Sequence, residues 1–314
     1  MTKLKLILTI LLLILLTGCD VIDDFFGKNK ETETNPENIT TPSIINLTNS
    51  TEENTTQVSV LVVEENVFVP PRGSNLSLYV LDVDGYSSIV LKQQASLLID
   101  SGLEADAQII LKRLRNIGID ELDHVIASNV QEENIGGMPY IIIQTSPAQI
   151  YESGISSPSS NYQLFKELYP NTTKIESDKL FSMKGSFIKL LVIYDDGSGF
   201  SSSNEDNSIV TKVSYEENQF LFMSNCGFDC LERIADHEIN ADVIIIDGSC
   251  DSTTLTFLQR VTPDVAIITG EVCEEIKSRF NFLDVPMFTS VEHGDIKIES
   301  DGENFNLKYL KMRE

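Results

Sequence analysis

Two apolar runs, Val243–Ile246 and Val265–Thr269, limit the fold of this chain more than any other feature. Both consist almost entirely of aliphatic residues and lack the alternation of polar and apolar positions expected of a strand with one face in water. Runs of this kind are typical of strands that are buried on both faces. They predict a sheet with packed layers on both of its sides.

The rest of the pattern combines strands with amphipathic helices. Helices are predicted at Glu104–Asn116, Tyr162–Tyr169, Cys226–Ile234, Thr253–Val261 and Glu271–Phe280. Further strands are predicted at Leu76–Asp82, Ser88–Gln93, Ala95–Asp100, His124–Ala127, Gln149–Glu152, Ser186–Tyr194, Ser208–Tyr215, Gln219–Met223, Pro286–Thr289, Asp295–Glu299 and Asn304–Leu310. This order favours an α/β protein in which two sheets pack together and the helices lie outside.

The first 19 residues have the organisation of an export signal. Two lysines precede an apolar stretch, Leu6–Leu16, which is too short to span a bilayer comfortably. The following Leu16-Thr17-Gly18-Cys19 resembles the lipobox at which bacterial-type lipoproteins are cleaved and lipidated. We therefore predict a lipoprotein signal peptide at 1–18 and a lipid anchor on Cys19, which would hold the protein at the extracytoplasmic face of the cell membrane. The alternative is an uncleaved anchor with an incidental cysteine.

The segment 19–57 is rich in Asn, Thr, Glu and Ser and has few large apolar side chains, so it is predicted to form a disordered tether. The folded domain is predicted to span 58–314, and roughly 255 residues suit one large α/β domain. Asn-x-Ser/Thr sequons occur at Asn38, Asn46, Asn49, Asn54, Asn75 and Asn171. They indicate a glycosylated stalk, or they arise by chance in an Asn/Thr-rich segment.

The chain is strongly acidic. Cleavage before Cys19 would remove Lys3 and Lys5 and leave 21 basic against 48 acidic side chains, a balance of −27. A surface this acidic repels phosphate backbones, which argues against direct binding to nucleic acid. The expected partners are therefore the membrane, through the lipid anchor, and an unidentified ligand or surface protein.

Six segments of the folded part follow one another in the order of a known family's motifs. They are Leu81-Asp82-Val83-Asp84-Gly85-Tyr86-Ser87, Ile99-Asp100-Ser101-Gly102, Ile135-Gly136-Gly137, Asn207-Ser208-Ile209-Val210, Phe220–Asn225 and Ala241-Asp242-Val243. Through them the chain resembles the metallo-β-lactamase fold, and in particular the hydrolase domain at the C-terminus of ComEC-type DNA-uptake proteins. The resemblance covers nearly all of Leu76–Leu310. It implies a metallo-β-lactamase-like αβ/βα four-layer sandwich with its active site at one edge of the sheets.

The resemblance also implies where a metal centre would lie, and the chain departs from the family at those positions. The family's loop carries a Thr-His-x-Asp-x-Asp-His run, and its histidines and carboxylates bind two zinc or manganese ions. The residues at or near the corresponding positions here are Asn129, Gln131, Glu133, Asn134, Asn225 and Asp247. Neutral amides are poor ligands for zinc, so no cofactor is expected. A weak calcium site built on Glu133 and Asp247, with amide oxygens assisting, is the alternative.

The three histidines do not restore the missing ligands. His124 opens a predicted strand, His237 lies in the acidic stretch Asp236–Glu238, and His293 lies in the turn Glu292–Gly294. None of them falls at a ligand position of the family. Each is therefore predicted to be a structural or surface residue.

The four cysteines of the folded part lie in its C-terminal third. Cys226, Cys250 and Cys273 each follow a strand that should end at the predicted site edge, and Cys230 lies one helical turn after Cys226. An even number in an exported chain permits disulfides. We hypothesise that a bridge such as Cys250–Cys273 fastens loops that a metal ion would otherwise tie together. A cysteine-based zinc site is the alternative, but the chain lacks a paired Cys-x-x-Cys spacing.

Taken together, these features predict a pseudo-hydrolase that keeps the sandwich but acts by binding a ligand or a surface partner. The second hypothesis is a working metal-dependent hydrolase for phosphodiesters or related esters, with an altered ligand set. A third, participation in a DNA-uptake or surface-assembly machine, rests on family analogy alone.

Overall fold

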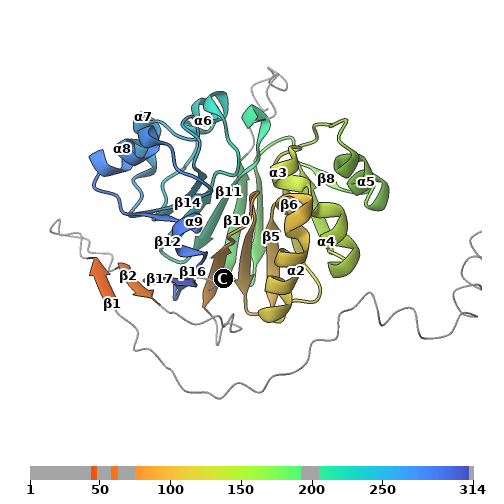
Figure 1. Cartoon of the computed structure of the whole chain (residues 1–314), viewed down its shortest axis with the longest axis horizontal. Helices are drawn as coiled ribbons and strands as arrows, with labels where there is room; N and C mark the ends of the chain where they lie inside the picture. Colours follow the sequence, from red (N-terminus) through yellow and green to blue (C-terminus); the bar gives the residue numbers. More distant parts are fainter. Residues whose placement is uncertain (1–43, 48–57, 63–74, 192–204, 311–314) are drawn as a thin grey trace, which may run out of the picture. The chain divides into compact units, whose positions relative to one another are not determined.

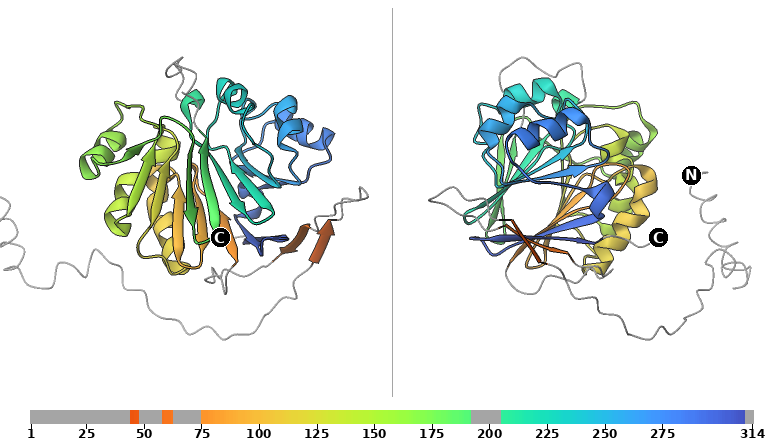
Figure 2. Two further views of the ribbon diagram at one scale, coloured as in Figure 1. Left: turned by 180° about the vertical axis from the view of Figure 1, so that it is seen from behind. Right: turned by 60° about the vertical axis from the view of Figure 1, so that its left-hand side comes forward.

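Two β-sheets pack face to face, and helices cover the outer side of each (Figure 1). The computed structural model describes residues 44–47, 58–62, 75–191 and 205–310, which all lie in one unit, Pro42–Glu314. Figure 2 shows the same layers from behind and from one side. Among the described residues, no helix is long and apolar enough to cross a membrane. The predicted signal peptide and Cys19 lie outside the described ranges.

The first sheet has the strand order β1-β2-β17-β16-β3-β4-β5-β6-β7-β8. Its strands are β1 (Ile44–Leu47), β2 (Val58–Val62), β3 (Leu76–Val80), β4 (Ser88–Lys92), β5 (Ala95–Ile99), β6 (His124–Ala127), β7 (Gln149–Glu152), β8 (Thr173–Lys174), β16 (Asp295–Ser300) and β17 (Phe305–Leu310). The strands β5 to β8 run parallel to one another. Their carboxyl ends therefore lie at the same edge of the sheet.

The second sheet has the strand order β15-β14-β13-β12-β11-β10-β9. Its strands are β9 (Lys179–Met183), β10 (Ser186–Leu191), β11 (Val210–Tyr215), β12 (Asn218–Phe222), β13 (Val243–Asp247), β14 (Val265–Thr269) and β15 (Met287–Thr289). The strands β12 to β15 are parallel, whereas β11 and β12 form an antiparallel hairpin, as predicted.

The helices fall into two groups by the sheet on which they pack. The helical segments are η1 (Glu104–Asp106), α2 (Ala107–Asn116), α3 (Glu132–Ile135), α4 (Met138–Thr145), α5 (Ser160–Leu168), η2 (Glu205–Asn207), α6 (Phe228–Ile234), α7 (Leu255–Val261), α8 (Glu274–Phe282) and α9 (Ser290–His293). Residues of α2, α4 and α5 share a buried cluster with the first sheet, and residues of α6, α7 and α8 share one with the second.

The two apolar runs of the sequence owe their composition to this layering. In β13, Val243 and Ile245 belong to the cluster between the sheets, while Ile244 and Ile246 belong to the cluster under the helices. Successive side chains of a strand point to opposite faces, so the four positions Val243–Ile246 of this central strand are all apolar. The predicted αβ/βα sandwich is therefore confirmed.

Several elements differ from the sequence prediction. The sequence pattern predicts no element at Met138–Thr145, yet this segment forms α4. Pro139 occupies its first turn, and its apolar face packs on α2 and α5. The strands β8 and β9 were also not predicted. The strand β1 lies within the segment predicted as a tether, where it pairs with β2. The helix α8 begins at Glu274 instead of Glu271, because Cys273 still has extended backbone at its N-cap.

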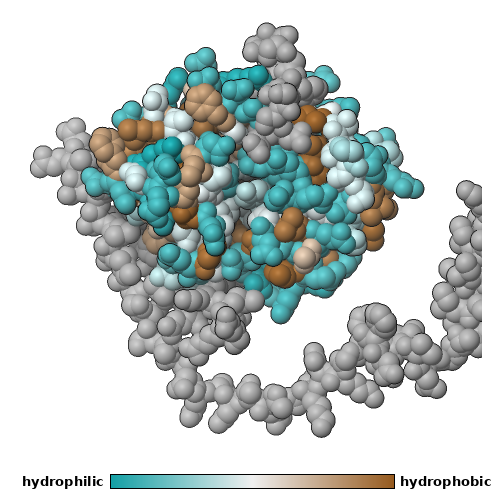
Figure 3. All heavy atoms as spheres, turned by 45° about the horizontal axis from the view of Figure 1, so that its top comes forward, coloured by the Kyte–Doolittle hydropathy of each residue, from teal (hydrophilic) through white to brown (hydrophobic). Residues whose placement is uncertain are grey.

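The face of the domain in Figure 3 is mostly hydrophilic, with apolar side chains scattered over it singly or in small groups. The exposed large apolar residues are spread over several elements and include Leu180, Phe187, Phe282 and Val291. Scattered exposure of this kind is normal for a soluble surface.

A buried ion pair connects the first helical layer to its sheet. Arg113 of α2 and Asp295 of β16 are 4% and 2% exposed, and Arg113 Nε lies 2.6 Å from Asp295 Oδ2. The other carboxylate oxygen of Asp295 accepts a hydrogen bond from the backbone N–H of Asp82. Burial raises the pKa of Asp295, and the Arg113 guanidinium opposes that rise.

We predict that Arg113→Ala lowers the free energy of unfolding by about 3–5 kcal/mol, because it leaves the Asp295 charge buried without its partner. Urea denaturation followed by circular dichroism measures the loss. The double variant R113M/D295N removes both charges and keeps an acceptor for Asp82, so it should recover most of the stability. As a control, Arg260→Ala removes an exposed partner of Asp236 and should change the midpoint little. Equal effects of Arg113→Ala and Arg260→Ala would contradict the prediction.

Candidate functional site

Loops from both sheets meet at one edge of the sandwich. The strands β5 and β6 of the first sheet and β12 and β13 of the second end there, and the loop Asp82–Ser87 follows β3, which runs in the same direction as β5. Backbone hydrogen bonds join these loops. Tyr86 N–H donates to the Glu133 carbonyl, and Ile209 N–H donates to the Ser128 carbonyl, each over 2.8 Å. The geometry thus places side chains from distant parts of the sequence around one site.

The Ile135-Gly136-Gly137 segment is explained by close backbone packing at this edge. A Cβ atom on Gly137 would lie 2.4 Å from the Ser101 carbonyl oxygen, which no side chain tolerates. Gly85 shows the same constraint, because its Cβ would lie 2.4 Å from the Glu133 carbonyl oxygen. The glycines therefore allow the loops after β3, β5 and β6 to touch.

Asp100, which follows β5, is the polar centre of the edge. It is 1% exposed and has a positive φ of 59°, a conformation that Asp tolerates better than most residues. Its carboxylate accepts the Ser128 backbone N–H over 2.9 Å, the Ser128 hydroxyl over 2.7 Å and Asn134 Nδ2 over 2.9 Å. Burial raises the pKa of Asp100 to about 6, and these hydrogen bonds oppose the rise.

A second chain of hydrogen bonds connects the two sheets. Asn129 Nδ2 donates to Ser208 Oγ, which donates in turn to the Asn225 carbonyl, each over 2.8 Å. Asn129 Oδ1 accepts the backbone N–H of Gln131 over 3.0 Å. The Asn225 side-chain amide donates to Gln131 Oε1. Amide groups from the loops after β6 and β12 thus bind one another directly.

A cavity of about 240 Å³ opens beside this amide pair. Its lining residues are Tyr86, Gln131, Glu133, Asn225, Cys226, Gly227, Ser249 and Asp251. Of the six residues predicted for the pocket, Gln131, Glu133 and Asn225 therefore line it. The other three, Asn129, Asn134 and Asp247, are at most 2% exposed and lie outside its lining.

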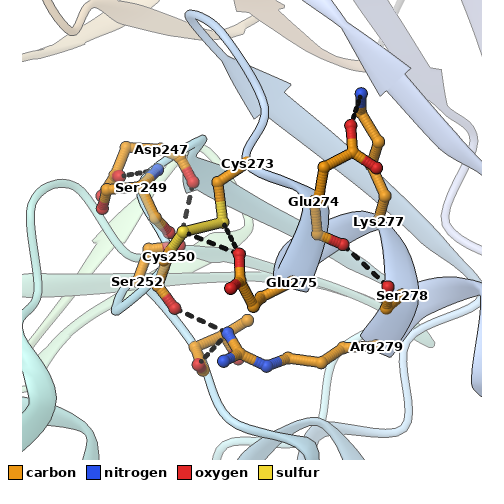
Figure 4. Close-up of a disulfide and its surroundings, with 11 residues drawn as sticks. Asp247, Ser249, Cys250, Ser252, Cys273, Glu274, Glu275, Lys277, Ser278 and Arg279 are labelled. Carbon is orange, nitrogen blue, oxygen red and sulfur yellow. Dashed lines mark hydrogen bonds and ion pairs between the residues drawn. A yellow bond between two sulfur atoms is a disulfide. The ribbon is translucent and has the colours of Figure 1, made fainter.

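Asp247 shapes its own loop instead of facing the cavity. Its Oδ1 accepts the Ser249 N–H over 2.7 Å, and its carbonyl accepts the Ser252 hydroxyl over 2.9 Å (Figure 4). The calcium alternative needs Glu133 and Asp247 at one place, but only Glu133 is part of the cavity lining. That alternative therefore lacks a shared site for its two carboxylates.

The residues at this edge do not fit a pair of zinc or manganese ions. The side-chain amides of Asn129, Gln131, Asn134 and Asn225 each bind a neighbouring protein group, as described above. Such sites are built from imidazole and carboxylate ligands around an open position, and Glu133 is the only residue of the predicted set that brings a carboxylate into the cavity. No chemical step through a metal at this position is supported.

None of the three histidines lines the edge cavity. His124 packs against the rings of Tyr151 and Phe181, and burial lowers its pKa. His237 Nδ1 lies 3.0 Å from an Asp178 carboxylate oxygen. His293 Nδ1 lies 2.9 Å from the carbonyl oxygen of Thr289. Their contacts are those of structural and surface residues.

The four cysteines within the described residues are joined in two disulfides, Cys226–Cys230 and Cys250–Cys273. The first is buried at the start of α6. The second joins the loop after β13 to the N-cap of α8, and Cys250 is exposed. The hypothesised bridge between Cys250 and Cys273 is thus the pairing in the structure.

Sequence reasoning missed several residues of the site. Asp100 and Ser208 lie in two of the family-like motifs, and no role was predicted for them. Each is a central member of one of the two hydrogen-bond networks. Tyr86 also lay in a quoted motif, and Ser249 and Asp251 followed the β13 segment. A polar residue directly after a buried strand is the signal that could have selected Asp100.

Of the predicted sequons, Asn75 and Asn171 are exposed, Asn46 lies in β1, and Asn38, Asn49 and Asn54 lie outside the described residues.

The backbone of this chain is similar to solved structures, whereas its sequence matches no family model and no curated protein. Among solved structures, the chain is similar to the metallo-β-lactamase fold protein YhfI of Bacillus subtilis, with 13% identity and a TM-score of 0.49 over 72% of this chain and 100% of that one.

Two further solved structures have a similar course of the backbone. One is a protein from Parabacteroides distasonis whose name describes it as a metal-dependent hydrolase. It has 7% identity and a TM-score of 0.44, over 79% of this chain and 98% of that one. The other is the short form of human tRNase Z, with 10% identity, a TM-score of 0.40, and coverage of 61% and 91%.

We predict that Asp100 lowers the free energy of unfolding as the pH rises from about 4 to about 6. Because the pKa of Asp100 is raised from 3.8 to about 6, the folded state holds this proton more tightly than the unfolded state. Its contribution is complete below pH 4 and is lost as pH rises through 6, a difference of about 3 kcal/mol. Urea denaturation at several pH values, compared with Asp100→Asn, measures it. Parallel pH profiles of the two proteins would contradict the assignment.

Proposed function

We propose that this protein is a membrane-anchored, extracytoplasmic pseudo-hydrolase of the metallo-β-lactamase type, and that its edge cavity binds a ligand without a metal centre. The observation that carries the proposal is the direct hydrogen bond between the side chains of Asn225 and Gln131. At the positions where the resembled family would hold metal, these two amides bind each other. Their side chains therefore form part of the cavity wall.

The cavity lining favours a small ligand that donates hydrogen bonds. Glu133 and Asp251 supply carboxylates, and Tyr86, Ser249 and the amide pair supply further polar groups. Ionised carboxylates only accept hydrogen bonds, so a protonated amine is the complementary group. The net charge of −25 for the whole chain strengthens the attraction for a cation and opposes a phosphodiester.

The cellular location is part of the same proposal. The basic start, the apolar stretch Leu6–Leu16 and the Leu16-Thr17-Gly18-Cys19 segment support export and lipidation at Cys19. The polar segment that follows would keep the domain at a distance from the membrane. The resemblance to ComEC-type hydrolase domains supports common ancestry within this proposal, and the altered ligand positions separate the chain from their chemistry.

We predict that the full chain, purified with its disulfides intact and without chelators, carries far less than one zinc or manganese ion. It should hydrolyse bis(4-nitrophenyl) phosphate no faster than the buffer. Elemental analysis and absorbance at the nitrophenolate band measure the two quantities. Stoichiometric metal that is lost in Glu133→Ala but kept in Glu132→Ala would establish the alternative, a metal-dependent hydrolase. Glu132 is the matched control because its carboxylate binds Asn161 instead of lining the cavity.

A diamine such as putrescine tests the ligand chemistry directly. It should raise the melting temperature of the full chain, because it binds only the folded state. Glu133→Gln should remove that rise, whereas Glu132→Gln should keep it. An equal rise in all three proteins would show nonspecific attraction to an acidic surface and would contradict a specific amine-binding cavity.

A further inference from the structure

The exposed disulfide Cys250–Cys273 lies against the carboxylate of Glu275 (Figure 4). Glu275 Oε2 is 3.1 Å from Cys250 Sγ and 3.3 Å from Cys273 Sγ. Within the described ranges, this is the one group of three His, Cys, Asp or Glu residues whose ligand atoms all lie within 4.8 Å of one another. A carboxylate placed against both sulfur atoms is not needed to form a disulfide, so the arrangement calls for another explanation.

From these contacts we propose that the Cys250–Cys273 disulfide is the oxidised, closed form of a metal site. When the disulfide is reduced, Cys250, Cys273 and Glu275 bind one divalent ion of the zinc class through two thiolates and one carboxylate. Three protein ligands leave a fourth position for water or another small ligand. Its three ligand residues do not line the edge cavity, although Cys250 lies between two residues that do, Ser249 and Asp251. The proposal goes beyond the ligand binding proposed for that cavity.

The ligand spacing suits a tetrahedral ion. Bonds of about 2.3 Å to sulfur and about 2.1 Å to oxygen place neighbouring ligand atoms roughly 3.6–3.8 Å apart. The distances from Glu275 Oε2 to the two sulfur atoms are 3.1 and 3.3 Å, so each separation has to grow by a few tenths of an ångström. Once the S–S bond is broken, rotation about the Cα–Cβ bonds lets the sulfur atoms separate, while the Cα atoms remain 5.5 Å apart. No movement of the backbone is required.

The loop that carries Cys250 is held by contacts that do not depend on the disulfide. Arg279 Nη1 donates to the carbonyl oxygens of Cys250 and Thr253, over 2.7 and 2.8 Å. Asp247 fixes the start of the same loop through the Ser249 N–H. On the other side, the Cys273 N–H donates to the Gly248 carbonyl over 2.9 Å. Reduction therefore leaves both cysteines near Glu275.

The charge of the reduced site favours a cation. Two thiolates and a carboxylate would repel one another without an ion between them. Cys273 is also the N-cap of α8, a helix of nine residues, and the positive end of the helix favours a thiolate there. Thiolate ligands select zinc-class ions over magnesium or calcium.

Reduction of the disulfide and binding of the metal ion balance in electrons and protons. A dithiol reductant supplies two electrons and two protons, so that it becomes a disulfide and Cys250 and Cys273 become thiols. The incoming ion then replaces the two thiol protons, which pass to solvent, and forms two metal–sulfur bonds and one bond to Glu275. Because Cys250 is exposed, the reductant reaches this bridge, whereas Cys226–Cys230 is buried.

Cobalt(II) is the probe that tests the proposal, because thiolate ligands give it a near-ultraviolet charge-transfer band. The full chain is mildly reduced with a phosphine without oxygen, and the mass after alkylation verifies that one disulfide has opened. We expect about one cobalt ion with this band in the reduced protein and none in the oxidised protein. Cys250→Ser should abolish the band, and Glu275→Gln should weaken binding roughly tenfold or more.

The controls separate this site from the edge cavity and from the other disulfide. Glu274→Gln changes the neighbouring carboxylate, which pairs with Lys277, and should leave cobalt binding unchanged. Glu133→Ala should also leave it unchanged. A missing band in the reduced chain, an undiminished band in Cys250→Ser, or unaltered affinity in Glu275→Gln would overturn the proposal. Loss of the metal in Glu133→Ala alone would instead overturn the proposed function.

Discussion

The hydrogen bonds of Asp100 are the interaction on which the arrangement of the edge depends. This buried carboxylate follows β5 and binds Ser128 and Asn134, which flank the loop after β6. The backbone carbonyl of Asn134 also accepts a hydrogen bond from the Ser101 N–H. An unpaired carboxylate at this depth would be strongly unfavourable, so the loop has to supply donors. The position of Gln131 and Glu133 at the cavity follows from this local folding.

Close backbone packing and side-chain hydrogen bonds together shape the same edge. Glycines 85 and 137 bring the loops so close that backbone atoms would collide with any side chain. A hydrogen bond between Asn129 and Ser208 then joins the two sheets. Hydrogen bonds between neutral groups are individually modest, but several of them in a buried network order the loops well. The disulfide Cys250–Cys273 fastens a further loop of this edge to α8.

Much of the fold could be predicted because its signals are local. The apolar runs predicted β13 and β14 to within one residue, because a strand covered on both faces is apolar along its length and ends in a polar residue only at the sheet edge, here Asp247 and Thr269. The sequence did not predict α4, because the run Ile141 to Ile143 resembles part of a strand. Packing against α2 and α5 stabilises the helical conformation of this segment. The boundary of α6 was shifted because Gly227 keeps extended backbone. Local patterns do not contain these tertiary contacts.

The sequence by itself determined the layered sandwich, the loops at this edge of the sheets and the identity of their polar residues. Each follows from apolar periodicity or from residue identity. Only the tertiary structure decided which polar groups face the cavity. It turned Asn134 toward Asp100 and Asp247 toward its own loop, and it brought Asp251 to the lining. It also placed Glu275 against two cysteines 23 residues apart. Hydrogen-bond partners come from distant segments, so spacing along the chain cannot assign them.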